Sequence, residues 1–260
     1  MKLSISNIGW DSADDEQMYV QLQKRGFSGL EIAPTRLFKP PVYEKISEAT
    51  DLAKRLKGEF GLEISSMQSI WFGRTESIFG TERERAALVE YTKCAIDFAR
   101  AAGCANLVFG CPKNRNKPVG ATENTAEKFF AEIGGYAAQN SCTIALEANP
   151  PIYNTNYINT TQEAFALAER LGAGIAVNLD FGTIIHNNES LESVRNNLGR
   201  ISHIHISEPY LAPIEKRELH YELADILRSG GYDKYVSIEM KSLLLDTVLE
   251  TLEYISEVFG

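Results

Sequence analysis

Four residues that can bind a metal ion lie at or near the ends of short apolar runs. Three are carboxylates that close the runs Ile144–Glu147, Val177–Asp180 and Ser237–Glu239, and the fourth is His205, in the alternating segment Ile201–Pro209. Three carboxylates and one imidazole suit one divalent ion of the Mg²⁺, Mn²⁺, Co²⁺ or Zn²⁺ kind, with positions left for substrate oxygens. The sequence therefore predicts a metal site, provided that these ends converge.

Short apolar runs suited to buried strands recur about every 30 residues, and segments with helical periodicity separate them. The expected strands are Leu3–Ile8, Gly29–Ala33, Glu63–Gln68, Asn106–Phe109, Thr143–Ala148, Gly174–Asp180, Ile201–Ile206 and Tyr235–Met240. The expected helices are Asp14–Arg25, Tyr43–Phe60, Glu82–Ala102, Glu123–Asn140, Thr161–Leu171, Leu191–Leu198, Leu219–Ser229 and Leu243–Val258.

This alternation predicts a parallel sheet with helical crossovers, and eight such units favour one closed (β/α)₈ TIM barrel, a single domain over residues 1–260. An open sheet with a dinucleotide site would need a Gly-x-Gly-x-x-Gly motif after the first strand, and Asn7–Ser12 lacks it. In a barrel, functional groups lie at the carboxyl ends of the strands. The four metal-binding candidates fall at the ends of strands five to eight, so they should converge.

The composition points to small-molecule partners. The chain has 260 residues, 44% of them hydrophobic, and a formal net charge of −9. That charge argues against nucleic-acid binding, because phosphate recognition depends on clustered Lys and Arg. No secretory signal or membrane-spanning run occurs, which predicts a cytoplasmic protein with no membrane partner. The four cysteines are irregularly spaced and are expected to be buried free thiols.

The segments described above resemble the xylose isomerase-like TIM barrels, sugar phosphate isomerases and epimerases that include the D-tagatose and D-psicose 3-epimerases. The matching segments are Ala145–Asn149, Asn178–Asp180, His203–Glu208 and Ser237–Met240. The resemblance implies that one divalent metal ion is held by Glu147, Asp180, His205 and Glu239. It also implies that Glu147 and Glu239 are catalytic and exchange protons with the substrate.

The sequence departs from the epimerases at two places. Thr183 stands where they carry a substrate-contacting His, with His186 three residues further on, and Tyr210 and Leu211 stand where they have an Arg. The resemblance therefore implies the metal and the type of reaction more strongly than the sugar. For His186 a structural role and a substrate contact stay about equally open, whereas for His220 a cap or packed position is favoured.

Two residues are expected to support the metal-binding side chains. His203 precedes His205 by two residues in the same strand, so it shares its face one layer lower. Asn178 has the same relation to Asp180. We expect both to be buried beneath the site, with Asn178 the first candidate for the polar neighbour that holds His203.

Six further residues are candidates for substrate binding: Gln68, Trp71, Asn114, Arg115, Glu208 and Lys241. Trp71 is expected to form an apolar wall of a sugar pocket, with packing in the core as the alternative. Arg115 could bind a phosphate or carboxylate through its guanidinium, although a solvated loop is slightly favoured. Lys241, Lys216 and Arg217 compete for that role, because barrel phosphate sites often lie after strands seven and eight.

The leading functional hypothesis is a metal-dependent isomerase or epimerase of a sugar or sugar phosphate, which would transfer protons through glutamates and a metal-stabilised enediolate. Self-association into a homo-oligomer is compatible with it. The alternatives are a metal-dependent dehydratase or hydrolase with the same ligands, and a non-catalytic metal-binding barrel. An apurinic-site endonuclease is disfavoured because the first half of the chain has no histidine.

Overall fold

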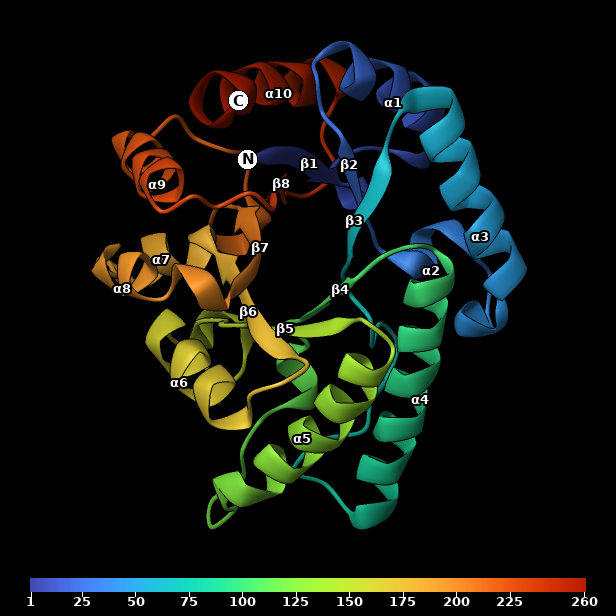
Figure 1. Ribbon diagram of the computed structural model, residues 1–260. Helices are drawn as coiled ribbons and strands as arrows, with labels where there is room; N and C mark the ends of the chain where they lie inside the picture. Colours follow the sequence, from blue (N-terminus) through green and yellow to red (C-terminus); the bar gives the residue numbers. More distant parts are fainter.

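The computed structural model describes residues 1–260 and contains a closed barrel of parallel strands, ordered β1 to β8, with the helices in an outer ring (Figure 1). The strands are β1 Lys2–Ser6, β2 Gly29–Ile32, β3 Glu63–Met67, β4 Asn106–Phe109, β5 Thr143–Glu147, β6 Ile175–Asp180, β7 Ile201–Ile206 and β8 Tyr235–Ile238. Pairing of β1 with β8, with Leu3 beside Val236, closes the barrel. The predicted fold is confirmed.

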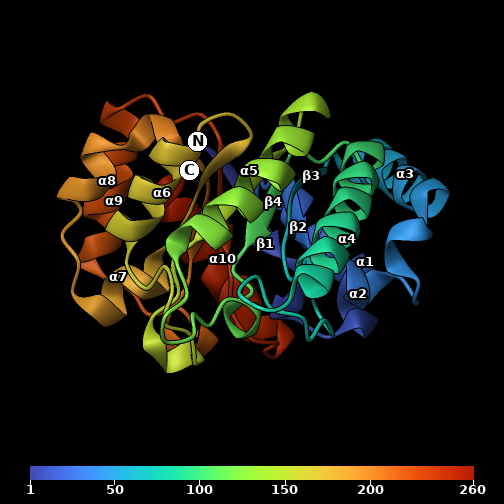
Figure 2. The same cartoon turned by 90° about the horizontal axis from the view of Figure 1, so that it is seen from below.

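Ten helices connect and cover the strands, and Figure 2 shows helices on both sides of the barrel. They are α1 Asp15–Lys24, α2 Pro34–Leu37, α3 Ile46–Arg55, α4 Glu82–Ala101, α5 Glu123–Gln139, α6 Thr161–Leu171, α7 Phe181–Asn187, α8 Glu192–Asn196, α9 Glu218–Ser229 and α10 Leu245–Phe259. No helix combines the length and the hydrophobicity that crossing a membrane requires.

Local sequence signals explain several of these boundaries. Helices α4 and α6 begin with capping boxes, in which Thr81 pairs with Glu84 and Thr160 pairs with Glu163. Each box satisfies backbone N–H groups that the first helical turn leaves free. The strands are nearly all buried, as parallel strands covered by helices must be. This is why they could be recognised as short apolar runs.

The structure differs from the expected elements after β6. Helix α7 begins directly after the strand, where a loop was expected, because the Asp180 carboxylate accepts a hydrogen bond from Thr183 N at 2.6 Å. Asp180 is therefore the N-cap of this helix. His186 lies in the last turn of α7 with its side chain exposed.

Candidate metal centre and substrate cavity

The four predicted metal ligands come together at the carboxyl ends of β5 to β8. One ligand atom from each of Glu147, Asp180, His205 and Glu239 lies within 4.8 Å of the others, and all four residues are buried. The Nδ1 atom of His205 is 3.0 Å from Glu147 Oε2 and 3.1 Å from Glu239 Oε2. Asp180 on β6 and His205 on β7 are partners in the strand register. Because side chains alternate between the two faces of a strand, the side chains of these two partners lie on the same face of the sheet.

Neighbouring polar groups orient the carboxylates. Ser207 Oγ donates to Asp180 Oδ2 at 2.5 Å, and Thr183 Oγ1 donates to Asp180 Oδ1 at 2.7 Å. Glu147 accepts amide hydrogen bonds from Asn149 at Oε1, 2.8 Å, and from Asn178 at Oε2, 2.7 Å. The carboxylates are thus held close together in spite of their charges.

The electrostatics of the centre favour a bound cation. Burial, together with the negative charges of Glu147 and Glu239, raises the pKa of Asp180 to about 7. Burial also raises the pKa of Glu239. Buried like charges at this spacing are costly unless a positive charge lies among them. Oxygen-rich donors with one imidazole nitrogen are also the ligands that Mg²⁺, Mn²⁺, Co²⁺ and Zn²⁺ accept, so the residues fit a divalent ion.

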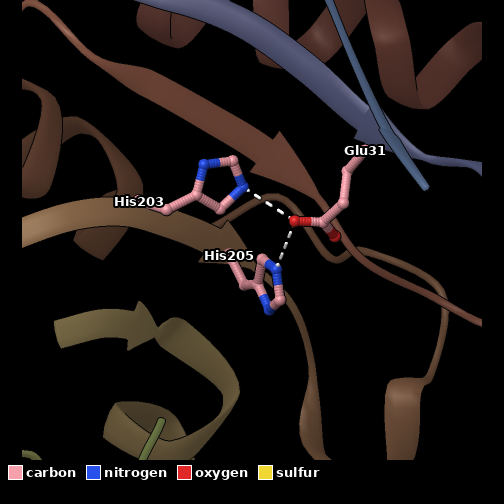
Figure 3. A group of neighbouring side chains, drawn as sticks. All are labelled: Glu31, His203 and His205. Atoms are coloured by element: carbon pink, nitrogen blue, oxygen red, sulfur yellow. Dashed lines mark hydrogen bonds and ion pairs between the residues drawn. The ribbon is translucent and has the colours of Figure 1, made fainter. Parts of the chain in front are cut away.

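A fourth acidic residue, outside the predicted ligand set, supports this centre from across the barrel. Glu31, on β2, is fully buried, and its Oε2 lies 3.0 Å from His205 Nε2 and 2.9 Å from His203 Nε2 (Figure 3). Gln68 Nε2 donates to Glu31 Oε1 at 3.2 Å. Because the Nε2 side of His205 faces Glu31, its Nδ1 atom faces the three metal-binding carboxylates. Sequence reasoning missed Glu31, and the available signal was a charged residue inside an apolar strand.

The two expected supporting residues are both buried, but they have different partners from those expected. His203 contacts Glu31 instead of Asn178. The Asn178 amide is used elsewhere, since its Nδ2 lies 2.7 Å from Glu147 Oε2 and 3.1 Å from His205 Nδ1. The expected His203–Asn178 contact is corrected accordingly: Asn178 orients the ligands directly, whereas His203 acts through Glu31.

A cavity of about 200 Å³ lies beside the cluster and is lined by Glu147, Asp180 and Glu239. Gln68, Asn149 and Tyr153 contribute further polar groups to its wall. A larger open hollow of about 810 Å³ lies near the amino ends of the strands, next to Lys2, Glu63 and Tyr235, and contains none of the metal-binding candidates. In TIM barrels the chemistry belongs to the carboxyl ends, so the smaller cavity is the candidate substrate site.

Of the six expected substrate-binding residues, Gln68 lines this cavity. Trp71 does not, because its ring packs against Phe109 and Phe129 and its Nε1 donates to Thr92 Oγ1 at 2.9 Å. The core position corrects the expectation of a pocket wall. Packing between the third and fourth βα units explains the burial of Trp71.

The structure differs from both expectations for Arg115, a solvated loop position and an anion-binding guanidinium. The side chain is fully buried, with Nη1 donating to Glu147 O at 2.8 Å and Nη2 donating to Asn149 Oδ1 at 2.8 Å and to Ile158 O at 3.3 Å. These acceptors occupy both terminal nitrogens of the guanidinium, and Nε is buried without a partner. Asn114, in the loop after β4, is buried as well. Its Nδ2 donates to Arg74 O at 3.1 Å and to Glu76 O at 2.8 Å, so it connects this loop to the loop after β3.

The remaining candidates lie in loops around the site. Glu208 is buried and paired with Arg217, whose Nη2 lies 2.6 Å from Glu208 Oε2, so both shape the loop after β7 and are not free to bind substrate. Lys241 is exposed, and its backbone N donates to Leu211 O at 3.0 Å. His220 is buried, and its Nδ1 lies 2.9 Å from the Tyr254 hydroxyl. This agrees with the packed position that the sequence favoured.

The fold and the centre together define a (β/α)₈ barrel with a buried carboxylate–histidine cluster at the carboxyl ends of β5 to β8. The chain belongs to the xylose isomerase-like TIM barrel family, whose sequence model matches residues 20–257. This match confirms the family resemblance seen in the sequence. Among curated proteins, none matches the sequence significantly.

Solved structures share the fold at low sequence identity. D-Psicose 3-epimerase, solved in the presence of D-fructose, is 16% identical with a TM-score of 0.80, covering 100% of both chains. The 3-keto-D-glucoside 4-epimerase from E. coli is 17% identical with a TM-score of 0.76, covering 99% of this chain and 98% of that one. The IolI protein, solved with a bound zinc atom, is 16% identical with a TM-score of 0.73, covering 100% of both chains.

Proposed function

We propose that this protein is a metal-dependent sugar isomerase or epimerase. The observation that carries the proposal is the pair Glu147 and Glu239, two buried carboxylates that both reach His205 Nδ1 and both line the cavity. The solved epimerases with the same fold support it. Two carboxylates beside one small cavity are the groups that proton transfer at a carbon next to a carbonyl requires.

The metal ion would be held by Glu147, Asp180, His205 and Glu239, and when bound it would supply positive charge to adjacent carbonyl and hydroxyl oxygens of the substrate. Zn²⁺, Mn²⁺, Mg²⁺ and Co²⁺ are all compatible with this donor set. Elemental analysis after reconstitution should find about one equivalent of ion per chain, and its absence would count against the proposal.

The surroundings of the two glutamates differ, which gives them different tasks. Glu147 accepts amide hydrogen bonds from Asn149 and Asn178, so its oxygens are fixed. Glu239 accepts no amide hydrogen bond, and its close polar partner is His205. We assign Glu239 to removing the proton, because fewer hydrogen bonds stabilise its anion and leave it more basic. Glu147, protonated at the start of the step, would give its own proton to the opposite face of the same carbon, and exchange with solvent would then remove the abstracted proton from Glu239.

The test is a panel of ketoses and aldoses incubated in deuterated water with the metal-reconstituted protein. Deuterium in an isomeric sugar is the expected result, because proton exchange through a carboxylate takes up solvent hydrogen. Water loss or bond cleavage without isomerisation would favour the dehydratase or hydrolase alternative. Metal binding without turnover on any sugar would favour a non-catalytic barrel.

A further inference from the structure

An exposed aromatic side chain lies at the edge of the candidate substrate cavity. Tyr210, in the loop after β7, is 57% exposed, and its backbone N donates to Tyr153 Oη at 2.8 Å. The two rings have centroids 6.2 Å apart and planes inclined by 59°. Tyr153 lines the cavity, so the pair extends its wall from beside the metal-binding carboxylates toward solvent.

The backbone that presents Tyr210 is strained. Tyr210 has φ +63° and Leu211 has φ +54°, and two consecutive left-handed residues without glycine are uncommon. The conformation is held by hydrogen bonds from Leu211 N to Glu208 O at 2.9 Å and from Lys241 N to Leu211 O at 3.0 Å. Leu211 itself lines the cavity. Strain of this kind clusters at ligand-binding sites, where surrounding contacts maintain it.

The size and charge of the cavity limit what it can enclose. Its volume of about 200 Å³ is below the roughly 300–1,000 Å³ of pockets that enclose drug-sized ligands. Three of its lining residues are carboxylates, and none is Lys, Arg or His. Arg115 is fully buried and does not line the cavity, and both terminal nitrogens of its guanidinium donate to protein acceptors. An uncharged, hydroxylated ligand suits this wall better than a phosphate does, and a second ring would have to lie outside, beside Tyr210.

We propose that Tyr153 and Tyr210 form a subsite for the second sugar ring of an uncharged glycoside whose reacting ring occupies the cavity. This inference rests on the proposed function and names its substrate class. A tyrosine ring offers a broad apolar face to the C–H face of a sugar at low entropic cost, with a hydroxyl for its polar edge. Tyr210 would then determine specificity without touching the reacting atoms.

The test measures dissociation constants by calorimetry on the Mn²⁺-loaded protein. The probes are D-glucose, D-fructose, isomaltulose, glucose 6-phosphate, and the glucosyl-glucoses kojibiose, nigerose, maltose and isomaltose, which differ in the hydroxyl that is linked. We expect at least one disaccharide to bind roughly 3–10-fold more tightly than its parent monosaccharide, the range that an aromatic contact supplies. Glucose 6-phosphate should bind no more tightly than glucose.

Variants assign that gain to the subsite. Tyr210→Ala should remove the advantage of the disaccharide, and Tyr210→Phe should restore it. Tyr221→Ala is the matched control, since Tyr221 is 40% exposed on α9 and contacts Glu257. Tyr210→Asn serves as a second variant without the ring, because Asn tolerates the left-handed conformation and keeps the loop intact.

The outcomes separate this inference from the proposed function. If monosaccharides bind but no disaccharide binds more tightly, or if Tyr210→Asn keeps the advantage, the subsite is refuted while the proposed function stands. Tighter binding of glucose 6-phosphate would refute the uncharged substrate. If the metal-loaded protein binds no sugar, both proposals fall. If Tyr210→Ala changes only the oligomeric state in solution, the exposed ring belongs to a contact between copies and the subsite is refuted.

Discussion

Glu31 Oε2 lies 3.0 Å from His205 Nε2, across the interior of the barrel from β2 to β7. An imidazole that donates its Nε2–H to a carboxylate keeps its Nδ1 lone pair for another partner. Glu31, which is not one of the predicted metal ligands, therefore orients the His205 ring so that Nδ1 points to the metal-binding carboxylates.

Replacing Glu31 with Gln should weaken metal binding by about 10–100-fold, the usual cost of losing a partner behind a metal-binding histidine. The Gln amide can donate to His205 Nε2 and so favour the tautomer with its proton on Nδ1. Competition with a chelator measures the dissociation constant for Mn²⁺. Glu63→Gln is the control, because Glu63 pairs with Lys57 at the opposite end of the barrel. Equal affinities for wild type and Glu31→Gln would contradict this role.

Replacing Glu239 with Gln should reduce turnover by about 10²–10⁴-fold, the range for a positioned acid or base. Glu147→Gln should also reduce turnover, but Glu239→Gln should have the larger effect on deuterium uptake from solvent. Metal occupancy is measured in parallel, because both residues are candidate ligands. Turnover and deuterium uptake close to wild type in both variants would remove this pair from the mechanism.

A methyl group at Gly110 should disturb the centre, because a Cβ there would lie 2.8 Å from Glu147 Oε1. Gly110→Ala is expected to displace the carboxylate and to lower metal affinity and turnover together, with a smaller effect on the unfolding temperature. Gly135→Ala, in α5, is a suitable control, since its Cβ would meet nothing within 4 Å. Chelator competition measures the metal affinity of each variant, and turnover and thermal unfolding are measured in parallel. Unchanged metal affinity in Gly110→Ala would show that a methyl group at this position does not displace Glu147.

The buried His220 should make stability depend on pH. Burial, and to a smaller extent the charge of Arg217, lowers the pKa of His220 to about 4, whereas in the unfolded chain it is about 6.5. Between these values only the unfolded chain binds the proton, so the free energy of unfolding falls as the pH falls from about 6.5 to about 4. The full loss from this residue is about 3 kcal/mol, and above pH 6.5 it vanishes.

Urea unfolding of metal-free wild type and His220→Gln at pH 7, 5.5 and 4.5 measures this effect. The difference in stability between them should shift in favour of the variant as the pH falls, because Gln does not titrate there. His186→Gln, at an exposed position, is the control. A difference independent of pH would show that burial of His220 does not drive the dependence.

The sequence was sufficient for the barrel and for the four clustered residues, because both depend on local signals. A buried parallel strand is a short apolar run, and its last residue lies at the functional edge. Glu31 could not be paired with His205 in this way, since 174 residues separate them and only closure of the barrel brings them together.

The loops were harder to predict for a similar reason. Whether Arg115 faces solvent or lies beneath Glu147 depends on how the loops after β4 and β5 pack, and no residue near Arg115 in the sequence encodes that. Helix α7 was missed because it begins directly after β6, without a loop that would mark its start. Asp is a common N-cap, but its presence at a strand end does not by itself distinguish a capped helix from a loop.

Asp180 belongs to two structures at once, the candidate metal centre and the first turn of α7, through the hydrogen bond from Thr183 N. A cation beside Asp180 would withdraw electron density from the carboxylate that accepts this bond. The hydrogen bond from the Thr183 amide would then weaken, although Thr183 itself does not contact the ion. Its nitrogen and proton chemical shifts, and its exchange rate with deuterated water, should therefore change on metal loading before any sugar is added. The chain carries at this position a natural spectroscopic reporter of occupancy, readable without turnover and without knowledge of the substrate.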